Sequence, residues 1–293
     1  MEKTYLVEVE DSASRTRRSY QTALHKYQSR RWLGRISWVT WLLVLGTVLF
    51  WFFTAYRVAQ VGGAHSLSAI LTDIIDNAIN VQDKDNDILT KILTTYGAKD
   101  NSLILQGQYW RFITPIFLHV NALHVGLNMF NLLILGVFLE RILGHFRFLL
   151  IYLVTGVIGV IASFYFAPQE ISVGASGAIF GLVGAYSTFV LVHRRALSYG
   201  GIPSLLWLLI VIGLNLSIGL FVQNVDNYAH LGGLISGCVL GWWFTPLYRP
   251  TPGYGLQDVH SLTRTWPLVL LTLLGTLVLA LIALHLMGAK LSL

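Results

Sequence analysis

The stretch that decides the fold is GASGAIFGL at residues 174–182, which opens a long apolar segment and contains one serine, Ser176. Small residues spaced in this way within an apolar segment are typical of two membrane helices that pack closely. The serine is then either one more small packing residue or a nucleophile inside the bilayer. The rest of the chain has to decide between these two interpretations.

The composition of the chain is that of a membrane protein. Its 293 residues are 55% hydrophobic and only 12% charged, whereas a soluble domain carries about a quarter charged residues. Apolar runs of about 20 residues, the length that spans a bilayer, recur along it. We therefore expect an all-α polytopic membrane protein that lies in the lipid bilayer and has no nucleic-acid partner.

Seven transmembrane helices are expected from the apolar runs at 37–58, 115–139, 146–167, 174–193, 204–222, 227–247 and 267–288. They divide the chain into a basic N-terminal arm, a six-span core with a long outer loop, a cytoplasmic linker, and a seventh span with a short outer tail. These regions are residues 1–36, 37–248 with the loop at 59–114, 249–266 and 267–293.

The charges of the loops predict the orientation of the chain. Lys and Arg gather in the N-terminal arm and in every second loop, while the loops between carry mainly acidic residues. By the positive-inside rule, the N-terminus is cytoplasmic and the C-terminus lies outside. The basic arm resembles neither a signal peptide nor a transit peptide, which favours the cell membrane as the location.

Polar residues that are costly inside a membrane gather at the outer ends of the second, fourth and sixth spans. The second span holds His119, His124 and Asn128, the fourth opens with Ser176, and the sixth contains His230. All three spans enter from the outer face, so these residues lie at similar depth. His124 and Asn128 are four residues apart and share one helix face.

Glycines predict how the serine and the histidine meet. The sixth span has a stripe of glycines at four-residue spacing, Gly233, Gly237 and Gly241. The fourth span has a glycine side as well, formed by Gly177, Gly181 and Gly184. Parallel helices with glycine faces bring their backbones closer than leucine-faced helices do. If these faces meet, Ser176 and His230 come into contact although they lie far apart in the sequence.

Such a pair fits the chemistry of acyl transfer. A serine hydroxyl is a weak nucleophile until a neighbouring base takes its proton, and histidine is the usual base. His124, Asn128 and the Ser176 backbone N–H are candidates for the donors that an oxyanion needs. Asp226, one turn before His230, falls at the membrane edge, so a Ser176–His230 dyad is the simpler interpretation.

We expect no metal and no cofactor. The histidines are accompanied neither by an H-E-x-x-H motif nor by a carboxylate at their depth, which argues against zinc. Asp83, Asp85 and Asp87 begin like a calcium loop, but Ile88 and Thr94 replace its glycine and its glutamate. We interpret this run as a solvated acidic loop.

The motifs together resemble those of the rhomboid intramembrane serine proteases. They are WRFITPIFLH at 110–119, HVNALHVGLNM at 119–129, GASGAIFGL at 174–182 and AHLGGLISG at 229–237. The resemblance covers about residues 95–245. It implies a rhomboid-like helical bundle, and some members of the family have six spans plus one.

The resemblance also implies roles for single residues. Ser176 would be the nucleophile and His230 the general base, while His124 and Asn128 would help to form the oxyanion hole. Further residues would support the site or the architecture: Gly174 and Gly177 beside the serine, Phe180 against the catalytic histidine, and Trp110, Arg111, Glu140, Arg141 and Gly144 as structural positions. For His119, two roles remain open, lining the cavity and tying the first loop.

We therefore expect an intramembrane serine endopeptidase that cleaves single-span transmembrane proteins near the outer membrane face. One alternative is a catalytically inactive rhomboid-like protein that binds transmembrane helices for trafficking or quality control. In that case the Ser176 hydroxyl would bond back to a helical carbonyl, as packing serines do. A small-solute transporter would show internal repeats, and none is visible in the sequence.

Overall fold

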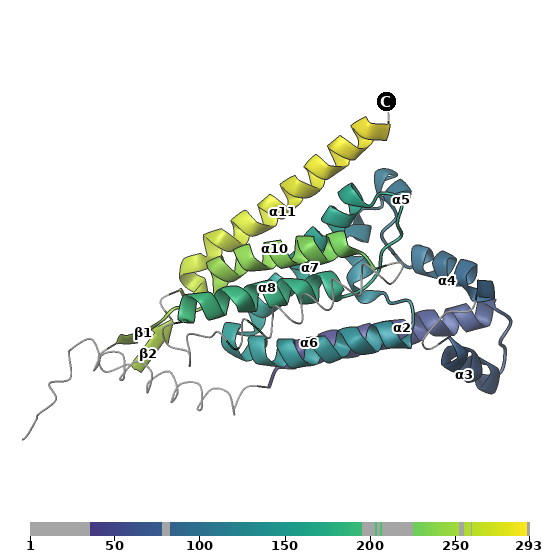
Figure 1. The fold of residues 1–293 in the computed structure, drawn as a ribbon, viewed down its shortest axis with the longest axis horizontal. Helices are drawn as coiled ribbons and strands as arrows, with labels where there is room; N and C mark the ends of the chain where they lie inside the picture. The colour runs from purple at the N-terminus through teal and green to yellow at the C-terminus, as the bar shows by residue number, and fades with distance from the viewer. Residues whose placement is uncertain are drawn as a thin grey trace, which may run out of the picture.

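The computed structural model describes residues 36–77, 83–194, 203, 206, 225–251, 255–258 and 260–291. They form a bundle of long helices with shorter elements at both ends (Figure 1). In chain order the elements are α2 (Trp38–Val61), α3 (Leu67–Asp76), α4 (Asp83–Thr95), α5 (Asn101–Leu105), η1 (Tyr109–Phe112), η2 (Thr114–Phe117), α6 (Ala122–Leu143), α7 (His145–Phe166), α8 (Ser176–His193), α10 (Asn227–Phe244), β1 (Tyr248–Thr251), β2 (Gly255–Asp258) and α11 (Leu262–Leu291).

The expected bundle of membrane-spanning helices is confirmed. Five of the described helices are long and apolar enough to cross a membrane: α2, α6, α7, α8 and most of α11. Helix α10, which contains several glycines and three polar residues in its first turn, is not among these five. The span expected at 204–222 lies outside the described residues except for Leu206, so the number seven stays a prediction.

Local boundaries differ from the expectation in three places. The second span begins at Ala122 rather than at 115, because the side chain of Asn121 accepts a hydrogen bond from the His124 N–H and caps the helix there. The acidic run that we interpreted as a loop opens α4, where negative charge is favourable at a helix N-terminus. The residues expected as a linker include an antiparallel pair, β1 and β2, in which Pro250 and Gly255 disfavour helix.

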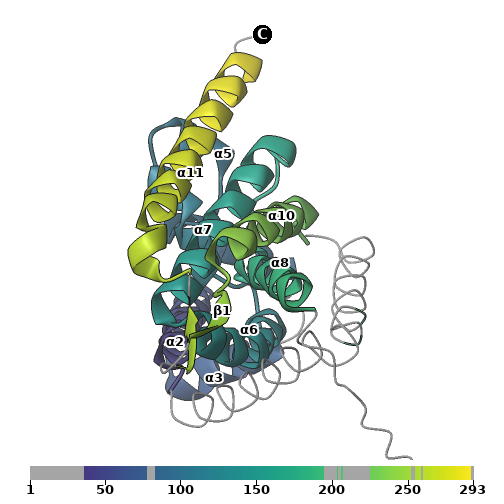
Figure 2. The ribbon, with the colours of Figure 1, turned by 90° about the vertical axis from the view of Figure 1, so that its left-hand side faces the viewer.

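The helices differ strongly in how much of their surface is buried. In their most apolar stretch, 72% of α8 and 67% of α7 is buried inside the structure, against 11% of α11. Figure 2 shows α7, α8 and α10 together, with α2 and α6 on one side of them and α11 on the other. The centre of the bundle is therefore the group of helices that carries Ser176 and His230.

The glycine faces of α8 and α10 meet, as the sequence predicts. A Cβ atom added to Gly233 would overlap the carbonyl oxygen of Gly177, and one added to Gly237 would overlap that of Gly181. On α8, a Cβ atom on Gly184 would overlap the carbonyl oxygen of Leu234. Only residues without a side chain allow two backbones to approach this closely.

A buried carboxylate joins three helices at the end of the bundle opposite Ser176. Glu140 of α6 is 1% exposed. Its oxygens accept hydrogen bonds from the N–H groups of Val39 and Thr40 and from the Thr40 hydroxyl, at 2.6–3.1 Å. It also contacts Nδ1 of His145, at the start of α7, at 2.5 Å. Glu140 thus caps the N-terminus of α2 from another helix, which is favourable for a negative charge.

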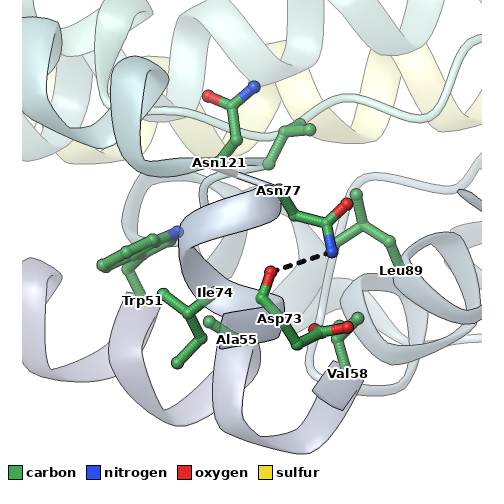
Figure 3. A pocket seen from close by; sticks show the side chains of 9 residues that line it. Trp51, Ala55, Val58, Asp73, Ile74, Asn77, Leu89 and Asn121 are labelled. Carbon is green, nitrogen blue, oxygen red and sulfur yellow. Dashed lines mark hydrogen bonds between the residues drawn. The ribbon is translucent and has the colours of Figure 1, made fainter. Parts of the chain in front are cut away.

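The loop at 59–114 folds back on the other end of α2. Figure 3 shows a small cavity between α2, α3 and the start of α6, which is lined by Trp51, Ala55, Val58, Asp73, Ile74, Asn77, Leu89, Val120 and Asn121. Its volume is about 30 Å³, which suits a single water molecule rather than a ligand. The cavity is lined by neither Ser176 nor His230.

Candidate active site

Ser176 and His230 lie at the same end of two neighbouring helices. Ser176 is the first residue of α8, and His230 is in the first turn of α10. The Oγ atom of Ser176 is 2.7 Å from Nε2 of His230. In a neutral histidine whose Nε2 is unprotonated, the serine hydroxyl donates to this nitrogen, which is the arrangement required for proton transfer.

The hydroxyl of Ser176 behaves differently from the other serine hydroxyls of α8 and α10. Ser187, also on α8, donates to the Val183 carbonyl at 2.9 Å, and Ser236 on α10 donates to the Gly232 carbonyl at 2.7 Å. These are the back-bonds expected of packing serines. At the first position of its helix, Ser176 instead pairs with a histidine from another helix.

Phe180 fixes the plane of the histidine ring. It lies one turn after Ser176, and its ring stacks on that of His230 with centroids 4.5 Å apart and an angle of 15° between the planes. His230 is 6% exposed. Gly177 lets α8 approach the backbone of α10 next to His230, because an added Cβ atom there would be 3.3 Å from the carbonyl oxygen of Ala229.

Asp226 has a structural partner of its own. Its Oδ1 atom accepts a hydrogen bond from the Ala229 N–H at 2.9 Å, so the carboxylate caps the N-terminus of α10. Among the described residues, Nδ1 of His230 has no hydrogen-bond partner. Within this part of the chain the arrangement is a pair rather than a triad.

His124 and Gly174 form the wall opposite the histidine base. Gly174 has a φ of +134°, and a Cβ atom there would be 3.0 Å from the His124 ring and 3.7 Å from Oγ of Ser176. A side chain at this position would be strained and would press on the ring of His124. The glycine therefore allows His124 to approach the serine, the place where a donor to an oxyanion is needed.

The other polar residues of this region are engaged with the backbone. The amide nitrogen of Asn128 donates to the carbonyl of His124 at 3.0 Å, within its own helix. Nε2 of His119 accepts from the Ala175 N–H at 3.3 Å, and its ring lies edge-on to that of His124, with centroids 4.9 Å apart. His119 thus ties the segment before α6 to the loop before Ser176.

Backbone N–H groups are available at the N-terminus of α8. The N–H groups of Gly174 and Ala175 already donate to the Pro115 carbonyl, at 2.8 Å, and to His119. The first N–H groups of a helix have no acceptor within it, and the helix dipole makes this end favourable for negative charge. The N–H groups that begin at Ser176 are therefore the natural donors to an oxyanion beside Oγ.

The structural positions expected from the motifs make local contacts. Arg111 is 3% exposed and donates to the carbonyls of Thr94 and Ala98 and to the side chain of Gln108. Sequence reasoning missed Lys99, which binds carbonyls at the end of α7 and in the loop after it, and Asn101, which binds a carbonyl in the last turn of α7. Lys99 is one of three lysines in the loop at 59–114, so residue type alone did not distinguish it.

No metal centre is formed within the described part of the chain. There, no group of three or more His, Cys, Asp or Glu side chains is placed to bind an ion. The chemistry that this arrangement supports is that of a serine activated by a histidine.

Comparison with known proteins points to one family. The model of the rhomboid domain matches residues 106–247. The chain is 47% identical over 148 residues to the rhomboid protease GluP of Bacillus subtilis, which covers 50% of this chain and 28% of that protein. It is 42% identical over 163 residues to the mitochondrial RHOMBOID-like protein 6 of Arabidopsis thaliana, covering 55% of this chain and 52% of that protein.

A third relative matches over a greater length. RHOMBOID-like protein 5 of Arabidopsis thaliana is 35% identical over 226 residues, which are 75% of this chain and 72% of that protein. This chain thus spans about a quarter and about half of the first two relatives and most of the third. Over this length and at this identity, the chain belongs to the rhomboid family of multi-pass membrane proteins.

Proposed function

We propose that this protein is an intramembrane serine endopeptidase in which Ser176 is the nucleophile and His230 the general base. The observation that carries the proposal is the 2.7 Å contact between Ser176 Oγ and His230 Nε2. The stacked ring of Phe180 supports it, because a ring held in one plane keeps Nε2 directed at the hydroxyl. The name of the relative GluP, a rhomboid protease, is consistent with it.

The first half of the proposed reaction forms an acyl-enzyme. The proton of Ser176 passes to Nε2 of His230 while Oγ attacks the carbonyl carbon of the scissile peptide bond. The negative charge that develops on the carbonyl oxygen is stabilised by the Ser176 N–H and by the ring of His124. His230 then gives its proton to the leaving amine, and the carbon–nitrogen bond breaks.

The second half hydrolyses the ester. Water gives a proton to His230 and adds to the acyl carbon, and the proton returns to Oγ as the carboxylic acid leaves. Asn128 acts in this scheme by supporting the turn of α6 that carries His124, to whose carbonyl it donates. Water has to reach the site, which fits its place at one end of the bundle, where Ser176 is half-buried rather than enclosed.

The proposed substrates are single-span transmembrane proteins in the cell membrane, cut near its outer face. With the N-terminus in the cytoplasm, the α8 end that carries Ser176 faces outward. A substrate helix must expose its scissile bond to be cut, so small or helix-destabilising residues near that face are expected. An inactive, helix-binding member of the family would not need a serine and a histidine in contact.

The test is labelling of the purified protein with a fluorophosphonate probe. Oγ of Ser176 would attack phosphorus, fluoride would leave, and the proton would pass to His230, so only an activated serine reacts. We expect labelling of the wild type and its loss in both Ser176→Ala and His230→Ala. Ser187→Ala is the matched control, because that hydroxyl bonds to its own helix, and it should label like the wild type.

Two outcomes would contradict the proposal. One is a wild type that stays unlabelled at high probe concentration near pH 8 while it remains folded. The other is labelling that persists in Ser176→Ala, which would place the reactive serine elsewhere. In the first case the helix-binding alternative would become the better account.

A further inference from the structure

Lys99 is a charged side chain with no exposed surface. It lies between α4 and α5 in the outer loop, and its exposed fraction is 0%. Burying an ammonium group is costly unless hydrogen bonds replace its water. Neither the dyad nor the oxyanion wall uses this residue, so its burial requires another explanation.

The ammonium group binds the end of α7. Its Nζ atom donates to the carbonyl of Ala167 at 2.5 Å and to that of Glu170 at 2.8 Å. Ala167 is the C-cap of α7, and the last carbonyls of a helix have no partner within it. A positive charge is also favourable at this end of a helix. Two residues further on, the side-chain amide of Asn101 donates to the carbonyl of Phe164 at 2.7 Å.

The backbone of Lys99 binds the next part of the same loop. Its N–H donates to the Ser172 carbonyl at 3.0 Å, and the Ser172 N–H donates back at 3.3 Å. After Ser172, the loop is bound by Pro115 through Gly174 and by His119 through Ala175. Ser176 follows directly. The segment from Ala167 to Ser172 is therefore fixed by one residue of the outer loop.

We propose that Lys99 is a positioning residue for acyl transfer: by binding residues 167–172 it fixes the N-terminus of α8, and with it Ser176 Oγ and the neighbouring N–H groups. This inference rests on the proposed peptidase function. Lys99 touches neither member of the dyad and acts through the loop alone. A displacement of about 1 Å at a reacting atom can cost about a hundredfold in rate, so a loop contact can control the chemistry.

The charges around Lys99 agree with this role. Burial lowers the pKa of Lys99 to about 8, while the carboxylates of Asp226, Glu170 and Asp100 act in the opposite direction. The ammonium form therefore persists at neutral pH. Asp226 caps the helix that carries His230, so the charge lies near the starts of both helices of the dyad.

The experiment compares Lys99→Met, Lys99→Arg and the matched control Lys91→Met. Methionine fills a similar volume but offers no donor, whereas arginine keeps the donors and the charge. Lys91 lies in the same outer loop and is exposed. The probe is the fluorophosphonate, with its maximal inactivation rate and its half-saturating concentration measured separately at pH 7.5.

We expect Lys99→Met to lower the maximal rate by about ten- to a hundredfold with an unchanged half-saturating concentration. Lys99→Arg should recover most of the rate, and Lys91→Met should react like the wild type. Hydrogen exchange should become faster in peptides covering 167–175 of Lys99→Met and stay unchanged in peptides covering β1 and β2. That localised change separates a displaced loop from a protein that has lost its fold.

The inference is overturned if Lys99→Met reacts as fast as Lys91→Met. It is also overturned if the rate falls while exchange at 167–175 stays as in the wild type, because the loop would then not transmit the effect. An unlabelled wild type is a different result. It contradicts the proposed function, and the role of Lys99 in catalysis falls with it.

Discussion

The helices α10 and α2 are attached to the bundle in two different ways. α10 contacts α8 through its backbone, at glycines where even a Cβ atom would overlap a carbonyl oxygen. α2 has a single glycine, Gly46, with nothing within 4 Å of its added Cβ atom. It is instead attached at its N-terminus, where Thr40 and the neighbouring backbone bind the carboxylate of Glu140.

The difference follows from what each helix has to position. Ser176 and His230 must meet within hydrogen-bonding distance, and two helices with large side chains between them could not bring these residues so close. α2 carries no residue of the dyad, and ordinary packing of side chains such as Val39 and Trp51, together with the polar contact at its end, is sufficient to define its place. Backbone contact is thus found where the chemistry requires precision.

The largest effect is expected when a side chain is added between α8 and α10. Gly237→Leu would force the carbonyl of Gly181 away, which should destabilise the protein by about 3 kcal/mol or more and abolish fluorophosphonate labelling. Gly46→Leu adds the same side chain to α2 where there is space, and should change neither property. Thermal unfolding in detergent and labelling measure both.

A folded Gly237→Leu protein that labels like the wild type would contradict the role given to the backbone contact between α8 and α10. It would mean that the two helices can separate without moving Ser176 from His230. Equal damage from Gly46→Leu would show instead that added volume is harmful anywhere in the bundle.

The backbone contact is the part of the site that could be predicted from the sequence. Glycines at four-residue spacing on α10 and a small-residue side on α8 are local patterns, and the parallel topology brings them together. The pairing of Ser176 with His230 follows from that geometry. The stacking of Phe180 was implied by the resemblance to rhomboid proteases alone.

Other features could not be predicted because their partners carry no signal in the sequence. Lys99 binds the carbonyls of Ala167 and Glu170, groups that every residue possesses, across 68 and 71 positions of the chain. The start of α6 was placed too early because the residues before Asn121 are as apolar as a helix in a membrane. The side-chain cap at Asn121, seen in the structure, defines where α6 begins.

A smaller effect is expected at the attachment of α2. Glu140→Gln replaces one acceptor oxygen by a donor facing the N–H groups of Val39 and Thr40, which should cost about 1–3 kcal/mol of stability. The labelling rate at 25 °C should stay unchanged, because the change lies at the end of the bundle far from Ser176. Asp76→Asn, which alters an exposed carboxylate of α3, is the control for thermal unfolding.

This result would separate the contribution of α2 to stability from any contribution to the chemistry. If Glu140→Gln unfolded at the same temperature as Asp76→Asn, the cap would contribute nothing measurable. If it slowed labelling while the protein stayed folded, α2 would also be part of the machinery that positions the dyad.

The smallest effect is expected in the pH dependence of stability, and it concerns Lys99. Lys99 is a buried base near the Ser176 end of the bundle, whereas Glu140 is a buried acid at the opposite end. Burial lowers its pKa from 10.5 to about 8 in the folded protein. Between these values the unfolded chain binds more protons than the folded one, so this group makes the free energy of unfolding increase as pH rises. Below pH 8 both states keep the proton, and its contribution no longer changes with pH.

The measurement is the unfolding temperature of the wild type minus that of Lys99→Met, at pH 7, 8, 9 and 10. We expect this difference to shift by a few degrees in favour of the wild type above pH 8. The other groups that titrate in this range are present in both proteins, so their effect is removed by the subtraction. A constant difference would mean that the ammonium group is not desolvated in the folded state. Because the neutral amine keeps two N–H donors, one for each of the carbonyls of Ala167 and Glu170, its loss of charge should stabilise the fold without releasing the loop. The hydrogen bonds alone are then sufficient to attach the start of α8 to the loop at 59–114.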